Sequence, residues 1–153
     1  MLRKATYVTF LGIIVAVIGV ITLRNRLPIG PIVLVLSVVP LGGLLLTRRP
    51  LVGAVPDLIF GALDTGLLTI PALWGGVLFG VAGAIAGGVI GDALTDGIAG
   101  FFEGGIAEWL REQGIEESRE PVTTSLGKMT GCLLGGGLVL TIALLLGIAP
   151  EFA

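Results

Sequence analysis

The chain of 153 residues contains no histidine, one cysteine and few charges. Charged residues make up 13% of the sequence, whereas soluble domains have about 25%. The single Cys132 excludes a disulfide framework, and without histidine the sequence offers no His or Cys cluster for a metal. A formal net charge of −2 gives no sign of nucleic-acid binding. The sequence also shows no nucleophile beside a base and no phosphate-cradling motif, so we expect neither an enzyme nor a bound cofactor.

Hydrophobic residues make up 54% of the chain and gather into runs long enough to cross a bilayer. A helix of about 20 apolar residues spans the hydrocarbon layer. We therefore predict an all-α polytopic membrane protein, with a single membrane domain over 1–153 and the lipid bilayer as its surroundings. Three spans are clear, at about 6–23, 30–47 and 125–147. We expect Pro40 to kink the second of them.

The middle of the chain allows two interpretations. In the first, spans at about 57–79 and 84–110 are joined by a tight turn near GVAGAIAG, which gives five spans. In the second, one span covers 67–91, and residues 92–124 form an amphipathic surface helix and loop, which gives four spans. Apolar residues recur at helical spacing in this stretch, and both interpretations accommodate that pattern.

The basic residues favour five spans. That topology places seven of them on one side of the membrane: Arg3, Lys4, Arg48, Arg49, Arg111, Arg119 and Lys128. Only Arg24 and Arg26 fall on the other side, whereas four spans divide the nine as four against five. Because cytoplasmic loops are enriched in Lys and Arg, we predict five spans with a cytoplasmic N-terminus. Acidic loops on an apolar chain indicate a prokaryotic plasma membrane.

Four carboxylates lie well inside the two predicted middle spans. Asp64 lies in the first, and Asp92, Asp96 and Glu103 lie on one face of the second. An ionised carboxylate at the bilayer centre costs at least about 2.5 kcal/mol, and neither span contains Lys or Arg. We therefore predict that these four residues bind cations and protons, with Asp64, Asp96 and Glu103 as metal ligands. Asp57 is expected to be a helix N-cap.

Nearby oxygen atoms extend this candidate site. Thr65 and Thr69 are candidate neutral ligands, and Glu108 is a further accessory residue near the cytoplasmic end of the span. The cytoplasmic connection adds acidic residues: Glu112, Glu116, Glu117 and Glu120, of which Glu116 and Glu117 are candidate accessory residues. Oxygen-rich sites suit Mg²⁺, Mn²⁺ or Fe²⁺. The alternative is structural: the acids are protonated or hydrogen-bonded to threonines for packing, and the glutamates belong to a solvated loop.

From Gly76 through the second middle span, most residues at every fourth position are small. One stripe contains Gly76, Gly80, Ala84, Gly88, Asp92, Asp96, Gly100 and Gly104, and another contains Gly83, Gly87, Gly91, Thr95 and Ala99. Small residues at this spacing let helix backbones approach closely in lipid. The chain is too short to contain two internal halves, so we also expect a homodimer.

Four short motifs lie between residues 56 and 147: PDLIFGALDTGLLT, GDALTDGIAG, AEWL and EPVTTSLGKMTGCLLGGGL. They resemble motifs of the vacuolar iron transporter family, whose members exchange Fe²⁺ or Mn²⁺ for protons. The resemblance implies that Asp64 matches the family's first Asp and that Asp96-Gly97 matches its second motif. It also implies that Glu108-Trp109-Leu110 matches the family's exit segment towards the cytoplasm.

The chain departs from that family's pattern. Gly100 stands near the place of the family's Met, Glu103 is extra, and the family's Glu-rich cytoplasmic helices shrink to the residues around Glu116 and Glu117. Two N-terminal spans also precede the matching part, where the family has its remaining spans after it. We expect a proton-coupled divalent metal transporter. The alternative is a non-transporting membrane scaffold or modulator that packs through glycine-rich helix faces.

The two topologies predict opposite labelling of two positions. With Cys132 replaced, Ala82→Cys should react with a membrane-impermeant thiol reagent on intact cells, and Glu116→Cys should not. Five spans place residue 82 outside and residue 116 inside. Labelling at 116 together with protection at 82 would instead support the surface-helix topology.

Overall fold

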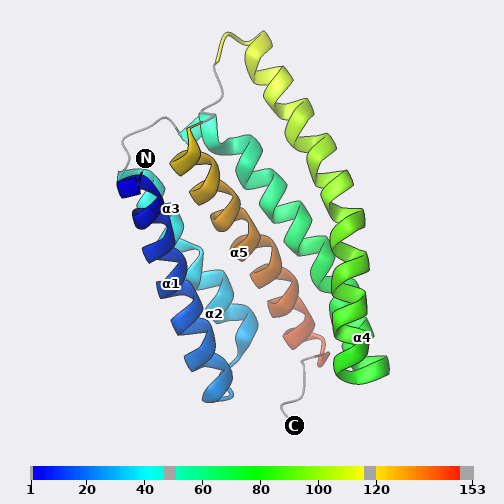
Figure 1. Ribbon diagram of the computed structural model, residues 1–153. Helices are drawn as coiled ribbons and strands as arrows, with labels where there is room; N and C mark the ends of the chain where they lie inside the picture. The colour runs from blue at the N-terminus through cyan, green and yellow to red at the C-terminus, as the bar shows by residue number, and fades with distance from the viewer. Residues whose placement is uncertain (1, 47–50, 116–119, 149–153) are drawn as a thin grey trace.

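The computed structural model describes residues 2–46, 51–115 and 120–148, and these form helices joined by short connections. In chain order the elements are α1 (Leu2–Arg24), α2 (Ile29–Leu36), α3 (Val38–Leu46), the 3-10 helix η1 (Leu51–Ala54), α4 (Val55–Glu112) and α5 (Pro121–Leu145) (Figure 1). By length and composition, four helical segments of the described chain are able to cross a membrane: Leu2–Arg24, Ile29–Leu46, Leu51–Glu112 and Pro121–Leu145. The predicted all-helical, membrane-compatible class is therefore confirmed.

Helix α4 folds back on itself at Gly80. This residue has φ 63° and ψ −149°, backbone angles that glycine adopts at low cost because it has no Cβ. The first arm (55–79) and the second arm (81–112) consequently run side by side in opposite directions (Figure 1). The reversal lies within the GVAGAIAG segment, where the first interpretation expects a turn. A straight span over 67–91 is not formed, because the chain reverses in the middle of it.

The second apolar segment bends one turn before its proline. Helix α2 ends at Leu36 and α3 begins at Val38, and between them Ser37 donates its hydroxyl to the Leu34 carbonyl at 2.6 Å. Pro40 has no N–H to donate to the Leu36 carbonyl, and its ring crowds that carbonyl. The predicted effect of Pro40 is thus present, with the bend displaced to Ser37.

Helix α5 occupies the centre of the bundle, between α2 and α3 on one side and the first arm of α4 on the other (Figure 1). It begins at Pro121, earlier than the expected start near 125, because proline is well accommodated in the first turn of a helix. A Cβ added at Gly131 would collide with the backbone of Leu58, and one at Gly61 with the backbone of Lys128. Glycines on both helices therefore allow the two backbones to approach closely.

The two small-residue stripes of the second arm differ in what they contact. We call Gly83, Gly87, Gly91, Thr95 and Ala99 the inner stripe. Its glycines face the first arm: a Cβ at Gly91 would lie 2.7 Å from the Pro71 ring, and one at Gly87 would collide with the Pro71 carbonyl. We call Gly88, Asp92, Asp96, Gly100 and Gly104 the outer stripe. Its three glycines have no atom within 4 Å of an added Cβ, and its two acids are exposed. Ala84, the first second-arm residue of that row, still meets the first arm, since a Cβ at Gly76 would lie 3.4 Å from its Cβ. From Gly88 onwards the glycines of the outer stripe make no such contact within one chain.

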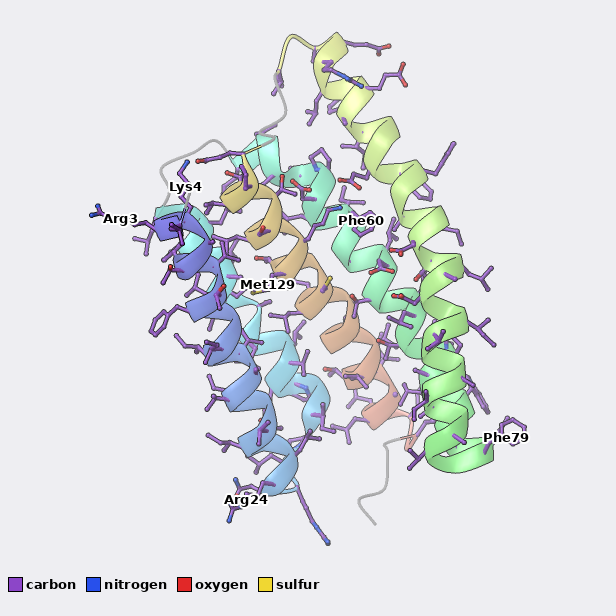
Figure 2. All side chains as sticks on the ribbon, in the orientation of Figure 1. Arg3, Lys4, Arg24, Phe60, Phe79 and Met129 are labelled. Carbon is purple, nitrogen blue, oxygen red and sulfur yellow. The ribbon has the colours of Figure 1, made fainter. Side chains whose placement is uncertain are left out.

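Basic side chains lie at the ends of the bundle. Arg3 and Lys4 are at one end and Arg24 is at the other (Figure 2). Lys4 forms an ion pair with Glu120, just before α5, so the starts of α1 and α5 are held at the same end. Of the other predicted basic positions at this end, Arg48, Arg49 and Arg119 lie outside the described residues. Much of the outside of the bundle between the ends is apolar; Val89 and Ile90 of the second arm, for example, are 67% and 64% exposed.

The contact between α4 and α5 gives a stability prediction. Gly61→Ala should lower the melting temperature of the detergent-purified protein, because the new Cβ must push the α5 backbone away, at a cost of about 1 to 3 kcal/mol. Gly19→Ala in α1, where a Cβ meets nothing within 4 Å, is the matched control and should leave melting unchanged or raise it. Equal melting of the two variants would contradict this packing.

Candidate functional site

Asp64 is one of two buried carboxylates on the first arm of the hairpin, the other being Asp57 in the first turn of α4. Asp64 is 9% exposed. Thr95, on the second arm, donates its hydroxyl to Asp64 Oδ1 at 2.7 Å, which joins residues 31 positions apart. The inner stripe makes this bond feasible, because Gly91, one turn before Thr95, packs against Pro71 and Leu68 of the first arm. The predicted first-arm carboxylate and the second arm are therefore brought together.

Asp92 and Asp96 flank this hydrogen bond from the outer stripe. Both are exposed, and both act electrostatically on Asp64. The Thr95 hydroxyl also lies 3.3 Å from the Asp92 carbonyl, so the same side chain is tied to both arms. At this level the hairpin thus has Asp64 inside and two carboxylates on an outer face that, within a bilayer, would meet lipid or another protein.

Glu103 lies apart from these three and has a partner on a different helix. Its Oε2 atom is 3.3 Å from Lys128 Nζ on α5. The same ammonium lies 3.7 Å from the ring centroid of Phe60 on the first arm (Figure 2). Sequence reasoning missed both partners. The two middle spans contain no Lys or Arg, as the sequence shows. The positive charge that pairs with Glu103 comes from Lys128 on α5, and no spacing within α4 predicts that contact.

The predicted metal ligands are not gathered into one group within a single chain. In the described ranges 2–46, 51–115 and 120–148, no three His, Cys, Asp or Glu side chains are placed to hold a metal ion together. Asp64 faces inward, Asp96 lies on the outer stripe, and Glu103 pairs with Lys128. Helical spacing places Asp96 and Glu103 on the same face of the second arm. Asp64 instead contacts that arm at Thr95, on the inner stripe.

The predicted accessory residues are divided between two environments. Thr65 and Thr69 face α5: a Cβ at Gly136 would lie 2.9 Å from Thr65 Cγ2 and 3.5 Å from Thr69 Oγ1. Thr69 donates to the Thr65 carbonyl at 2.6 Å, and the Thr65 side chain is hydrogen-bonded with Cys132. Both hydroxyls keep acceptor capacity. Glu108 is exposed, and Glu116 and Glu117 lie outside the described residues.

Asp57 is not the N-cap that the sequence suggests. The cap of α4 is Ala54, because η1 leads directly into the helix, and Asp57 falls in the first turn. There its carboxylate complements the positive end of the helix dipole. Asp57 is 6% exposed, and a Cβ added at Gly127 of α5 would lie 2.9 Å from the Cβ of Asp57. Asp57 therefore belongs to the contact between α4 and α5.

Together these observations define an all-helical chain with membrane-compatible helices and a hairpin that holds a buried carboxylate. No family model, curated protein or solved structure matches the chain. The resemblance to vacuolar iron transporters therefore remains a prediction that rests on its short motifs.

The bond between Asp64 and Thr95 gives a second stability prediction. Thr95→Val should destabilise the purified protein by about 1 to 3 kcal/mol, the cost expected when a buried polar group loses its hydrogen-bond partner. Thr95→Ser keeps the hydroxyl and is the control, and it should lose less stability. Thermal unfolding in detergent measures both variants. If the two variants melted at the same temperature, the hydrogen bond would not be what holds the arms together here.

Proposed function

We propose that this protein exchanges divalent metal cations for protons across a membrane. The observation that supports this most strongly is Asp64, a buried carboxylate hydrogen-bonded between the arms of an apolar hairpin. Removing its charge from water is costly unless a proton or a cation neutralises it. Asp92 and Asp96 lie within one turn of Thr95, on the outer face, and their negative charges would add to the attraction between Asp64 and a cation.

The proposed topology has five crossings with a cytoplasmic N-terminus. A straight helix of 62 residues, the length of the third apolar segment, would measure about 93 Å, roughly three times the hydrocarbon thickness. The reversal at Gly80 divides it into two arms, each longer than the about 20 residues that one crossing needs. The excess of basic residues at the end that carries Arg3 and Lys4 supports placing that end in the cytoplasm, in a prokaryotic plasma membrane.

Exchange follows from the alternation of two neutral forms of the hairpin. In one form Asp64 carries a proton and remains an acceptor for the Thr95 hydroxyl, and a neighbouring carboxyl group, Asp92 or Asp96, carries a second proton. In the other form both protons have left, and one divalent cation balances the two negative charges. Because an uncompensated Asp64 is unfavourable in the bilayer, loss of the proton is coupled to arrival of the cation.

A second copy of the chain would complete the ligand set, and we propose a homodimer for that reason. The outer stripe is the face that supports it, because Gly88, Gly100 and Gly104 leave room for a close helix contact. Two outer stripes in contact would bring Asp92 and Asp96 from both copies together. Oxygen ligands of this kind suit Mn²⁺, Fe²⁺ or Mg²⁺.

The open outer stripe also supports a second candidate function, a scaffold that packs against a partner without transporting. In that case its glycines would be essential and its carboxylates dispensable. Gly100→Leu should then abolish association, as measured by cross-linking in membranes, while Asp92→Asn and Asp96→Asn leave it intact. If the protein is an exchanger, Asp92→Asn and Asp96→Asn should reduce metal flux, whatever their effect on association.

Flux measurements test the proposed exchange. Asp64→Asn and Asp96→Asn should each reduce Mn²⁺ uptake into proteoliposomes by about tenfold or more, since even indirect metal contacts change affinity by about 10 to 100-fold. The uptake should be accompanied by proton movement in the opposite direction, recorded with an internal pH dye. Glu112→Gln, at the exposed end of α4, is the control and should transport normally. Unchanged uptake in both Asp variants would contradict the proposal.

A further inference from the structure

The two arms of α4 touch through longer and longer groups with increasing distance from the turn. Near the turn the backbones themselves are in contact, since a Cβ added at Gly87 would collide with the carbonyl of Pro71. Further along, the contact is between two side chains, Thr95 and Asp64. Beyond that level the ribbons of the two arms separate (Figure 1). The hairpin therefore has a narrow end at the turn and a wide end, which contains residues 99–112 of the second arm.

The wide end is bridged by an ion pair with a third segment. Lys128 of α5 places its Nζ atom 3.3 Å from Glu103 Oε2 of the second arm and 3.7 Å from the ring centroid of Phe60 of the first arm. Among the described residues, no other side chain of 96–112 forms a hydrogen bond or an ion pair with another helix. The long, flexible stem of lysine thus spans the place where the arms diverge.

We propose that Glu103 and Lys128 form a clasp that holds the wide end of the hairpin closed. When the clasp is released, the second arm pivots on the narrow end and Asp64 becomes accessible to water. This inference goes beyond metal exchange, because it concerns how the fold opens and holds or fails whether or not an ion is transported.

The narrow end has the properties of a pivot. Hinges are a few residues that absorb a change in backbone angles. Gly80 is suited to this, because it already has a positive φ and an added Cβ there would meet nothing within 4 Å. The hydrogen bond between Thr95 and Asp64 lies between this pivot and the clasp. A pivoting second arm therefore carries Thr95 away, and water replaces its hydroxyl as the donor to Asp64.

The clasp is strong enough to close the hairpin and weak enough to open without unfolding. The side chains of Glu103 and Lys128 are 28% and 35% exposed, and a partly solvated ion pair contributes much less than a buried one costs to break. Phe60 holds the ammonium over its ring, but that contact joins the first arm to α5. Loss of the Glu103 carboxylate alone is therefore sufficient to release the second arm.

A buried position between Thr95 and the clasp reports the opening. Ala99 lies on the inner stripe, one turn beyond Thr95, and is fully buried. In a chain with Cys132→Ala, the substitution Ala99→Cys introduces a thiol that a water-soluble thiol reagent reaches when the arm opens. Adding Glu103→Gln should raise the labelling rate in detergent, followed by mass spectrometry, about three- to fivefold, the factor expected when a partly exposed ion pair is lost. Lys128→Gln should have the same effect.

Four controls accompany the labelling. Lys128→Arg keeps the ion pair, and Glu112→Gln removes a different carboxylate from the exposed end of the same arm, so neither should speed labelling at position 99. Glu103→Gln combined with Lys128→Gln should label no faster than either alone, since both remove one interaction. Ala143→Cys, buried in α5, should stay protected in every background.

Spin labels measure the same motion without a substitution in the packed interior. Labels at the exposed positions Val52 and Phe101 span the wide end, and labels at Ile70 and Val89 span the narrow end. With Glu103→Gln, the distance between the first pair should lengthen, because the second arm moves away from η1. The distance between the second pair should not change.

Each outcome supports or overturns the clasp. Unchanged labelling at position 99, or an unchanged distance between the labels at the wide end, would show that the ion pair does not hold the arm. Labelling at position 143, or longer distances at both ends, would mean that the whole bundle loosens and that there is no pivot. A double variant that labels much faster than either single variant would show that the two side chains act separately. None of these measurements involves a metal, so the proposed exchange is tested separately by flux.

Discussion

The close approach of the two arms of α4 is the contact on which the rest of the candidate site depends. A single residue, Gly80, reverses the chain, and the glycines of the inner stripe then let the arms lie backbone to backbone. In lipid no hydrophobic effect drives helices together, so this close packing is the available source of association. It also fixes the height at which Thr95 meets Asp64.

The carboxylates of the hairpin are accommodated in three different ways. Asp64 accepts a hydrogen bond from the facing arm, Glu103 receives an ammonium from α5, and the two acids of the outer stripe face outward. A charge that is not compensated inside one chain has to be compensated by water, by an ion or by another protein. This requirement links the proposed homodimer to the proposed cation: the same outer stripe would supply both a packing surface and further oxygen ligands.

Much of the architecture could be predicted from local patterns. An apolar run bounded by basic residues marks α1, and the Gly/Ala-rich GVAGAIAG segment marks the reversal, because each is a property of a few neighbouring residues. The interruption at Ser37 is local too, since a proline disturbs the carbonyl about one turn before it. The wrong prediction also has a local cause: Asp57 is not a cap, because η1 runs straight into α4.

The sequence by itself determined that the chain is helical and membrane-compatible, and that carboxylates recur along the second half at helical spacing. Only the tertiary structure decided which of them have partners. Periodicity assigns residues to a face of one helix, but it does not say which helix that face meets. The pairing of Glu103 with Lys128 and Phe60 joins three helical segments, and the choice between inner and outer stripe depends on how the hairpin closes. Both are set by packing between distant parts of the chain, which no local pattern encodes.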